Sequence, residues 1–354
     1  MYYAGIDLHR NDVVIAIEDQ QGVGDKPRRF PSREPGAIVG YLAAHRPFQA
    51  VVEASCGYRW LYDLLTPLGT VVLAHPRRLR AIVDGRAKTD KLDAALLARL
   101  LRADLIPRAY VPPVAYAQLR DLTRARARLV RHEVEAKNEL HALLARRNIH
   151  PPFKTPFGKR WTKWVAQTPL GVVEQAVRAE LLRRLEHYAA ERERLDQVLA
   201  ELAPSFPEVE ALLCLRGVGL YTALLLVAEI GEPQRFADGR QVAAYAGLTA
   251  RVNQSGGHCY HGHITRQGSS WLRWALVQVA MKILPGDPAL QAFYTRLRKR
   301  SSAKIARVAV ARKLAAICWL RLMRWHYAAG IEEREFVSCA VMGGSGPVLG
   351  TGGR

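Results

Sequence analysis

Four acidic residues stand at positions that favour metal chemistry. Asp7 and Glu53 each end a short apolar, β-prone run, and Asp90 and Asp93 lie one helical turn apart. A spacing of three residues projects both carboxylates from one face of a helix. Carboxylate oxygens gathered at one point bind Mg²⁺, with Mn²⁺ as its substitute. Such ions activate a nucleophile and stabilise the leaving oxygen when a phosphodiester is cut.

Each of these acids also has an ordinary structural explanation. Asp90 and Asp93 can complement a helix dipole near a helix start. Asp7 can be a turn residue after a strand, and Glu53 a buried partner of an arginine. These explanations are favoured for each residue taken singly. The four acids together, in a strongly basic chain, favour the metal site.

A second candidate is Ser255, which stands between Gln254 and two glycines in what is expected to be an exposed basic loop. Glycines let a bulky phosphodiester approach a serine nucleophile, which needs a base, a cation or a metal to activate it. The nearby candidates are His258, His261, His263 and Arg266. The alternative is a flexible surface loop without a catalytic role, and the residues alone favour this alternative. Zinc is not expected from the histidines and Cys259, because no second ligand pair stands at a suitable distance.

Two further segments have features of nucleic-acid contacts. Gly217-Val218-Gly219, beside Arg216, separates two apolar helical stretches as in a helix–hairpin–helix, whose amide groups bind a DNA phosphate. An ordinary glycine-ended helix turn is the alternative. One long helix is expected to carry a basic face, either solvated or on a nucleic-acid backbone. Its basic residues are Arg296, Arg298, Lys299, Arg300, Lys304, Arg307, Arg312 and Lys313.

The composition supports a polyanionic partner. The 354 residues carry a formal net charge of +20, a field that attracts nucleic acid. A membrane surface is the rival, but no apolar run approaches the roughly 20 residues of a spanning helix. The N-terminus lacks the features of a signal peptide. Five widely spaced cysteines without a CxxC indicate a reducing cytosol.

The first hundred residues alternate strand and helix signals. Strands are expected at Tyr2–Ile6, Val13–Ile17, Arg28–Phe30, Ala50–Val52 and Thr70–Ala74. Helices are expected at 35–45, at 60–68 and from an N-cap at Thr89 through Leu101. An antiparallel meander followed by strand–helix alternation is the RNase-H-like layout, in which strand ends collect site residues.

The remainder is predicted to be helical. Long charged helices are expected from Tyr116 to about Leu202, interrupted at Pro151–Pro169, as an antiparallel hairpin or an oligomerising coiled coil. Its seam contains Leu181, Leu185, Tyr188, Leu195, Leu199 and Leu202, with Arg192 in one slot. Pro204 and Pro207 mark a boundary before a compact helical domain. The predicted fold is thus α/β plus all-α, with domains at 1–112, 113–204 and 205–330 and a disordered tail at 331–354.

These residues resemble the DEDD transposases of insertion-sequence family 110 over nearly the whole chain. The N-terminal motifs are Gly5-Ile6-Asp7, Glu53-Ala54-Ser55 and Thr89-Asp90-Lys91-Leu92-Asp93-Ala94. The C-terminal motifs are Gly217-Val218-Gly219, Ala246-Gly247-Leu248-Thr249, Ser255-Gly256, Ile264-Thr265-Arg266-Gln267-Gly268 and Leu272-Arg273. Each motif is short, and their order and spacing make the combination specific.

The resemblance implies a RuvC-like N-terminal domain that binds Mg²⁺ through the four acids. It implies that Ser255 becomes covalently linked to DNA phosphate during strand exchange. It also implies a coiled-coil linker that helps assemble a homo-oligomer, a dimer or tetramer, with a composite site between subunits. The partners would be donor and target double-stranded DNA and a structured non-coding bridge RNA as guide. The protein would be cytoplasmic, nucleoid-associated and prokaryotic, without membrane contact.

Contacts with nucleic acid are expected from residues around the glycine turn and the basic helix. They are Arg216, Gly217, Gly219, Arg266, Arg298, Lys299, Arg300 and Lys304. Two other functions fit parts of the pattern. A metal-dependent nuclease or junction resolvase would use the carboxylates without serine chemistry. A non-enzymatic nucleic-acid-binding remnant would have no reason to retain the four acids and the serine together.

Overall fold

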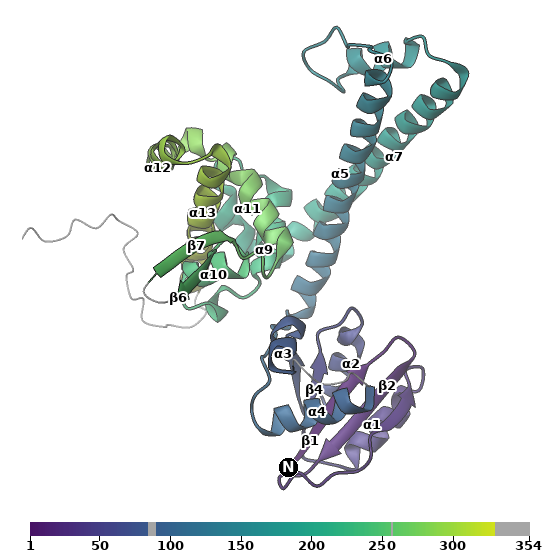
Figure 1. Cartoon of the computed structure of the whole chain (residues 1–354), viewed down its shortest axis with the longest axis vertical. Coiled ribbons are helices and arrows are strands. Elements are labelled where there is room, and N and C mark those ends of the chain that lie inside the picture. The colour runs from purple at the N-terminus through teal and green to yellow at the C-terminus, as the bar shows by residue number, and fades with distance from the viewer. Residues whose placement is uncertain (84–89, 256–257, 330–354) are drawn as a thin grey trace, which may run out of the picture. The chain divides into compact units, whose positions relative to one another are not determined.

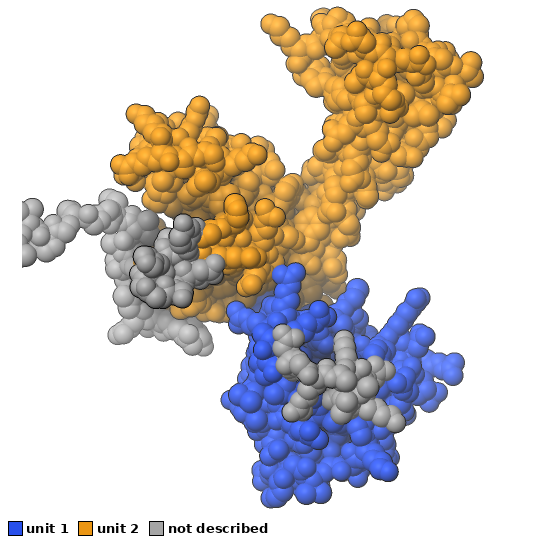
Figure 2. Space-filling view, viewed as in Figure 1, with its two compact units in different colours: residues 1–111 blue, residues 112–354 orange. Residues whose placement is uncertain are grey.

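The computed structural model describes residues 1–83, 90–255 and 258–329, with side chains described outside 83–93 and 252–261. The chain divides into two compact units, residues 1–111 and residues 112–354 (Figure 2). Each unit has its own hydrophobic core. The boundaries predicted at 112, 204 and 330 are not tested by this division and stay predictions.

A five-stranded sheet in the order β3-β2-β1-β4-β5 forms the centre of the first unit (Figure 1). Its strands are β1 (Tyr2–Leu8), β2 (Asp12–Glu18), β3 (Arg28–Pro31), β4 (Phe48–Glu53) and β5 (Thr70–Ala74). The first three strands pair as an antiparallel meander, and β4 and β5 add in parallel to β1. All five strands were predicted, and all except β3 from runs that are mainly apolar and contain β-branched residues.

Helices cover both faces of this sheet. They are α1 (Pro35–Ala43), α2 (Tyr58–Leu65), α3 (Pro76–Val83) and α4 (Asp90–Arg102). Ile38 of α1 and Leu61 of α2 pack on the face that contains Ile6 and Val52. The opposite face packs against α3 and α4. The arrangement is mixed α/β and consistent with an RNase-H-like domain. Helix α3 was not predicted, and the N-cap expected at Thr89 lies outside the described residues.

Two long helices open the second unit: α5 (Val114–Ala145) and α7 (Val172–Leu202), joined through α6 (Lys159–Gln167). Ion pairs link Arg126 to Asp196 and Glu133 to Arg192. A later residue of α5 therefore contacts an earlier residue of α7. The pair is therefore antiparallel, one of the two arrangements expected. The bond from Arg192 to Glu133, at 2.7 Å, explains a charged residue in the apolar seam.

The rest of this unit is a helical bundle with one β-hairpin. Its elements are α8 (Glu210–Leu213), α9 (Leu220–Ile230), α10 (Gly239–Tyr245), β6 (Ala250–Ser255), β7 (His258–Ile264), α11 (Ser270–Lys282), α12 (Pro288–Arg300) and α13 (Ala303–Ala328). Short 3₁₀ turns are Ala203–Ser205, Pro207–Val209, Pro233–Arg235 and Leu284–Gly286. Leu224, Leu276 and Leu314, from α9, α11 and α13, are fully buried in the shared core.

Two predictions for this region are wrong. The segment around Ser255, expected to be a loop, is the antiparallel hairpin β6–β7. The basic residues expected on one helix lie on two, because α12 ends at Arg300 and α13 begins at Ala303. Ser302 caps the second helix by accepting a hydrogen bond from the amide of Ile305 at 3.3 Å. The tail expected to be disordered lies outside the described residues.

Candidate active site

Strand register places Asp7 and Glu53 at the same edge of the sheet. β1 and β4 are parallel neighbours, with Ile6 opposite Val52. Asp7 and Glu53 each follow this pair by one residue, and neighbouring strands lie about 4.8 Å apart. The two acids therefore occupy adjacent positions where two parallel strands end.

The same two acids share a face of the sheet. Gly5 faces α4, because a Cβ atom on it would lie 2.0 Å from the carbonyl oxygen of Ala94. Val51 packs in the cluster that includes Leu97 of α4. Alternate residues of a strand point to the same face. Asp7 and Glu53, two residues beyond Gly5 and Val51, therefore lie on the face that α4 covers.

Helix α4 begins towards the Asp7 end of β1. Its last residue, Arg102, donates a hydrogen bond of 2.8 Å to Glu18, which lies opposite Tyr3 at the far end of β1. Ala94, near its start, packs with Val14, the register partner of Asp7. Asp90 and Asp93 form the first turn of this helix. Their side chains lie outside the described set, so the described geometry covers two of the four acids.

His9 is a neighbour of this edge that the sequence analysis did not single out. Its Nε2 atom lies 3.1 Å from Oδ2 of Asp7, whose side chain is 16 % exposed. The Asp-x-His spacing at a strand end was the available signal. No group of three or more metal-ligating side chains occurs among those the structure describes, which do not include Asp90 and Asp93.

Ser255 is the last residue of β6 and lies opposite His258, the first residue of β7. Its side chain is outside the described set. The base of the hairpin is held by hydrogen bonds from the amide of Thr265 to Thr249 at 2.8 Å and from that of Arg266 to Gly247 at 3.1 Å. Gly268 has φ +87°, and a Cβ atom there would lie 2.0 Å from the carbonyl oxygen of Tyr245. The strand ends are thus fixed closely against α10.

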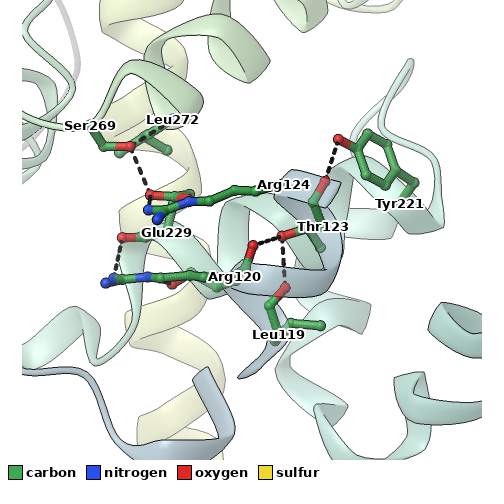
Figure 3. A network of polar contacts seen from close by, with 9 residues as sticks. Leu119, Arg120, Thr123, Arg124, Tyr221, Glu229, Ser269 and Leu272 are labelled. Carbon is green, nitrogen blue, oxygen red and sulfur yellow. Dashed lines mark hydrogen bonds and ion pairs between the residues drawn. The ribbon is translucent and has the colours of Figure 1, made fainter. Parts of the chain in front are cut away.

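A buried glutamate ties this region to the long helix α5 (Figure 3). Glu229 is fully buried and accepts hydrogen bonds from Arg124 at 2.7 and 3.0 Å and from the hydroxyl of Ser269 at 2.7 Å. Ser269 also accepts from the amide of Leu272 at 3.0 Å and so caps α11. Arg120 donates to the carbonyl oxygens of Ala228 and Glu229 at 2.6 and 2.9 Å. One carboxylate therefore joins three helices.

The charge state of this network follows from its geometry. Burial lowers the pKa of Arg124, but the hydrogen bonds and charge of Glu229 outweigh it and raise that pKa above its ordinary value. A buried carboxylate is costly without a cation and several donors. Glu229 has both, since Arg124 and the hydroxyl of Ser269 donate to its two oxygens. The sequence analysis did not single it out, because its partners lie far away in the sequence.

The glycine turn lies between α8 and α9. Gly217 has φ +81°, and a Cβ atom on it would lie 2.5 Å from Cβ of Lys282. Gly219 is the N-cap of α9 and offers no side chain to its free amides. Arg216 is exposed beside them and donates a long hydrogen bond of 3.5 Å to Pro285. The turn thus presents helix amides and a cation to solvent.

The second unit concentrates the positive charge of the chain. Residues 239–331 contain fifteen Lys and Arg and a single acid, Asp287, which is used to cap α12. Arg298, Lys299, Arg300 and Lys304 are exposed around the α12–α13 turn, and a cavity of about 460 Å³ is lined by Ala292, Thr295, Arg296, Lys299 and Arg300. Arg266 is exposed with φ +53°. Burial and the nearby charge of Arg266 lower the pKa of Arg273.

Comparison with known proteins gives matches over both units. A DEDD transposase profile of the IS110 type matches residues 4–149, and the profile described as "Transposase IS116/IS110/IS902 family" matches residues 209–295. The putative transposase y4qE of Sinorhizobium fredii is 30 % identical over 290 residues, which cover 78 % of this chain and 70 % of that protein. The chain belongs to the IS110 family of insertion-sequence transposases.

Other IS110-family relatives align over most of their length. The transposase for insertion sequence element IS1328 of Yersinia enterocolitica is 27 % identical, covering 89 % of this chain and 95 % of its own. A probable family 20 transposase of Pseudomonas aeruginosa is 28 % identical, covering 90 % and 93 %. Membership implies a protein that acts on DNA by cutting and rejoining it. No helix in the described ranges is long and apolar enough to span a bilayer.

Proposed function

We propose that this IS110-family transposase combines a Mg²⁺-binding carboxylate site with a serine nucleophile. The observation that carries the proposal is the placement of Asp7 and Glu53 at one edge and on one face of the sheet. The start of α4, which bears Asp90 and Asp93, lies towards that edge. The cleavage site would therefore be assembled around the carboxyl ends of β1 and β4.

The residues fit a hard divalent cation. Asp7 and Glu53 provide carboxylate oxygens at adjacent strand ends, and Asp90 and Asp93 provide two more from one helical turn. Mg²⁺ held there, or Mn²⁺ in its place, would supply positive charge to a phosphate undergoing attack. His9, within hydrogen-bonding distance of Asp7, would orient that carboxylate.

Ser255 would carry the strand-exchange step. Its hydroxyl oxygen attacks a DNA phosphorus, the bond from phosphorus to one deoxyribose oxygen breaks, and the hydroxyl proton passes to that leaving oxygen. Attack by the sugar hydroxyl of another strand on the serine-linked phosphate reverses the step and releases Ser255. One phosphoester is exchanged for another, so the cycle needs no external energy source. Its position at the end of β6, followed in the sequence by two glycines, supports access to a bulky substrate.

The basic second unit would hold the nucleic acids. Arg266, Arg298, Lys299, Arg300 and Lys304 would contact phosphates of donor and target DNA or of a structured guide RNA. The glycine turn, through Arg216 and the amides that follow Gly217 and Gly219, would bind one phosphate. A homo-oligomer would bring the carboxylates of one subunit to the serine of another.

A covalent-trapping assay tests the proposal. The full chain, Mg²⁺, the non-coding RNA that flanks the element and labelled duplex carrying the element junction are mixed and separated on a denaturing gel. A protein–DNA adduct is expected that is absent in Ser255→Ala and Asp90→Ala but retained in Ser270→Ala, which alters an exposed serine on α11. Cleaved DNA without an adduct, unchanged in Ser255→Ala, would instead establish a hydrolytic nuclease. An adduct formed equally without the RNA would show that the reaction needs no guide RNA.

A further inference from the structure

The charge of the long helical hairpin is distributed unevenly. Helix α5 contains six Lys and Arg and four acids, and α7 contains five Lys and Arg and seven acids. These two helices, which we call the shaft, are therefore neutral together. The connecting residues 146–171, which we call the hairpin tip, contain six Lys and Arg and no Asp or Glu. Six positive charges are thus confined to one end of a neutral shaft.

Within the described part of the chain, at least six of the eleven cations of the shaft form ion pairs, whereas one of the six at the tip does. Shaft pairs include Arg126–Asp196, Arg192–Glu133 and Lys137–Glu133. Arg147 at the tip pairs with Glu174 of α7. Lys154, Lys159, Arg160 and Lys163 are exposed, and none of them forms an ion pair within the described part of the chain.

The fold of the tip arranges these cations on one surface. Trp161 and Val165, one turn apart on α6, are buried in a cluster that includes Leu140 and Leu181 of the long helices. The rings of Trp161 and Phe157 lie 4.4 Å apart, centroid to centroid. With this face of α6 buried, Lys159, Arg160 and Lys163 occupy the solvent face at spacings of three and four residues.

This cluster of positive charges destabilises helix α6 when no anion is bound. Like charges three and four residues apart on a helix destabilise it, and Gly158 leaves the first amides of α6 without a side-chain cap. Both features become favourable against an anion. In Figure 1, α6 lies at the end of the hairpin where α5 ends and α7 begins. A partner with many closely spaced negative charges would complement the tip.

We propose that the hairpin tip is a nucleic-acid-binding site that takes the phosphodiester backbone of double-stranded DNA. Duplex DNA carries a negative charge about every 1.7 Å along its axis, so several cations on one small surface can each reach a phosphate. Flexible lysines bind phosphate as point charges and read no sequence. The site includes neither Ser255 nor the carboxylates, so it would hold DNA without taking part in the chemistry.

Salt-dependent binding of the full chain to a short duplex of unrelated sequence tests this inference. The variant Lys159→Gln/Arg160→Gln/Lys163→Gln is compared with Arg128→Gln/Arg183→Gln/Arg194→Gln, which removes three exposed cations from the shaft. The slope of log affinity against log salt should fall by about 0.9 for each phosphate that is no longer neutralised, up to about 2.7 for the tip variant. The shaft variant should keep the slope of the parent chain.

Circular dichroism confirms that both variants keep their helix content. Equal slopes for the tip and shaft variants would overturn the proposal, since the tip would then act only through net charge. A tip variant that retains duplex binding but loses binding to structured RNA or to vesicles of anionic lipid would also overturn it. The assay needs neither metal nor strand cleavage, so its result is separate from that of the trapping assay.

Discussion

The guanidinium group of Arg124, on α5, donates two hydrogen bonds to the carboxylate of Glu229, on α9, at 2.7 and 3.0 Å. Glu229 is fully buried, whereas the Arg124 side chain is 30 % exposed. The pair therefore anchors the long hairpin to the bundle that carries Ser255 (Figure 3). Its loss would affect both parts of the second unit.

Replacing Arg124 by methionine should destabilise the second unit by about 3 kcal/mol, because Glu229 would be left buried without its cation. The measurement is the shift of the thermal melting transition. Arg128→Met, at an exposed position on the same helix, is the control and should change little. Equal shifts for the two variants would mean that the Glu229 pair contributes nothing beyond surface charge.

The substitution Gly5→Ala should reduce metal-dependent cleavage strongly. The added Cβ would lie 2.0 Å from the carbonyl oxygen of Ala94, so α4, which begins with Asp90, must move away from β1. Gly40→Ala, in α1 of the same unit, meets no atom within 4 Å and serves as the control. Cleavage rates and melting temperatures are compared. Normal cleavage by Gly5→Ala would show that the packing of α4 on β1 does not position the site.

The substitution Gly268→Ala should abolish the serine–DNA adduct. Its φ of +87° disfavours any side chain, and the Cβ would lie 2.0 Å from the carbonyl oxygen of Tyr245, so the base of β6–β7 must shift. Gly262→Ala, within β7, would place its Cβ 3.7 Å from Arg251 and should retain the adduct. Adduct yield is measured on the denaturing gel of the trapping assay. Equal adduct yields from Gly268→Ala and Gly262→Ala would show that the base of the hairpin does not position the serine.

Stability should fall as the pH is lowered through the titration range of His326. Burial is the largest cause that lowers its pKa below the ordinary 6.5, against the raising effect of Glu208 and Glu232. The unfolded chain then takes up a proton near pH 6.5 while the folded chain does not, so acid favours unfolding from that pH down to the lower folded pKa. Melting temperatures measured from neutral pH downward should decline less in His326→Gln.

His187, exposed on α7, provides the matched control for this titration. His187→Gln should retain the pH dependence of the parent chain. If both variants follow the parent curve, His326 does not set the acid limit of stability.

Local patterns were sufficient to predict the five strands of the first unit, but not its helix α3. Apart from β3, each strand is a short, mainly apolar run that contains β-branched residues, so the ends at Asp7 and Glu53 could be located from the residues alone. Strand order then follows from the meander and the parallel additions. The contact between Asp7 and His9 was missed, although their spacing in the sequence was visible.

The second unit was harder to predict for physical reasons. The β6–β7 segment is polar and rich in glycine and histidine, so it lacks the apolar alternation that marks a strand, and pairing between its two halves supplies the order instead. The break after Arg300 had a local signal in Ser302, the cap of α13. Glu229 lies within an apolar helix, and its partners Arg124 and Ser269 are set by tertiary packing, which no local pattern encodes.

The anchoring of α5 near one of its ends makes the helix a lever. Arg120 and Arg124 fix the first turns to α9, while the helix continues to Ala145, roughly 30 Å further at 1.5 Å per residue. A tilt of about 5° at the anchor would displace the far end by about 3 Å over that length. A force applied at the tip would thus be amplified at Glu229. Through Ser269, it would also reach the segment that bears Ser255.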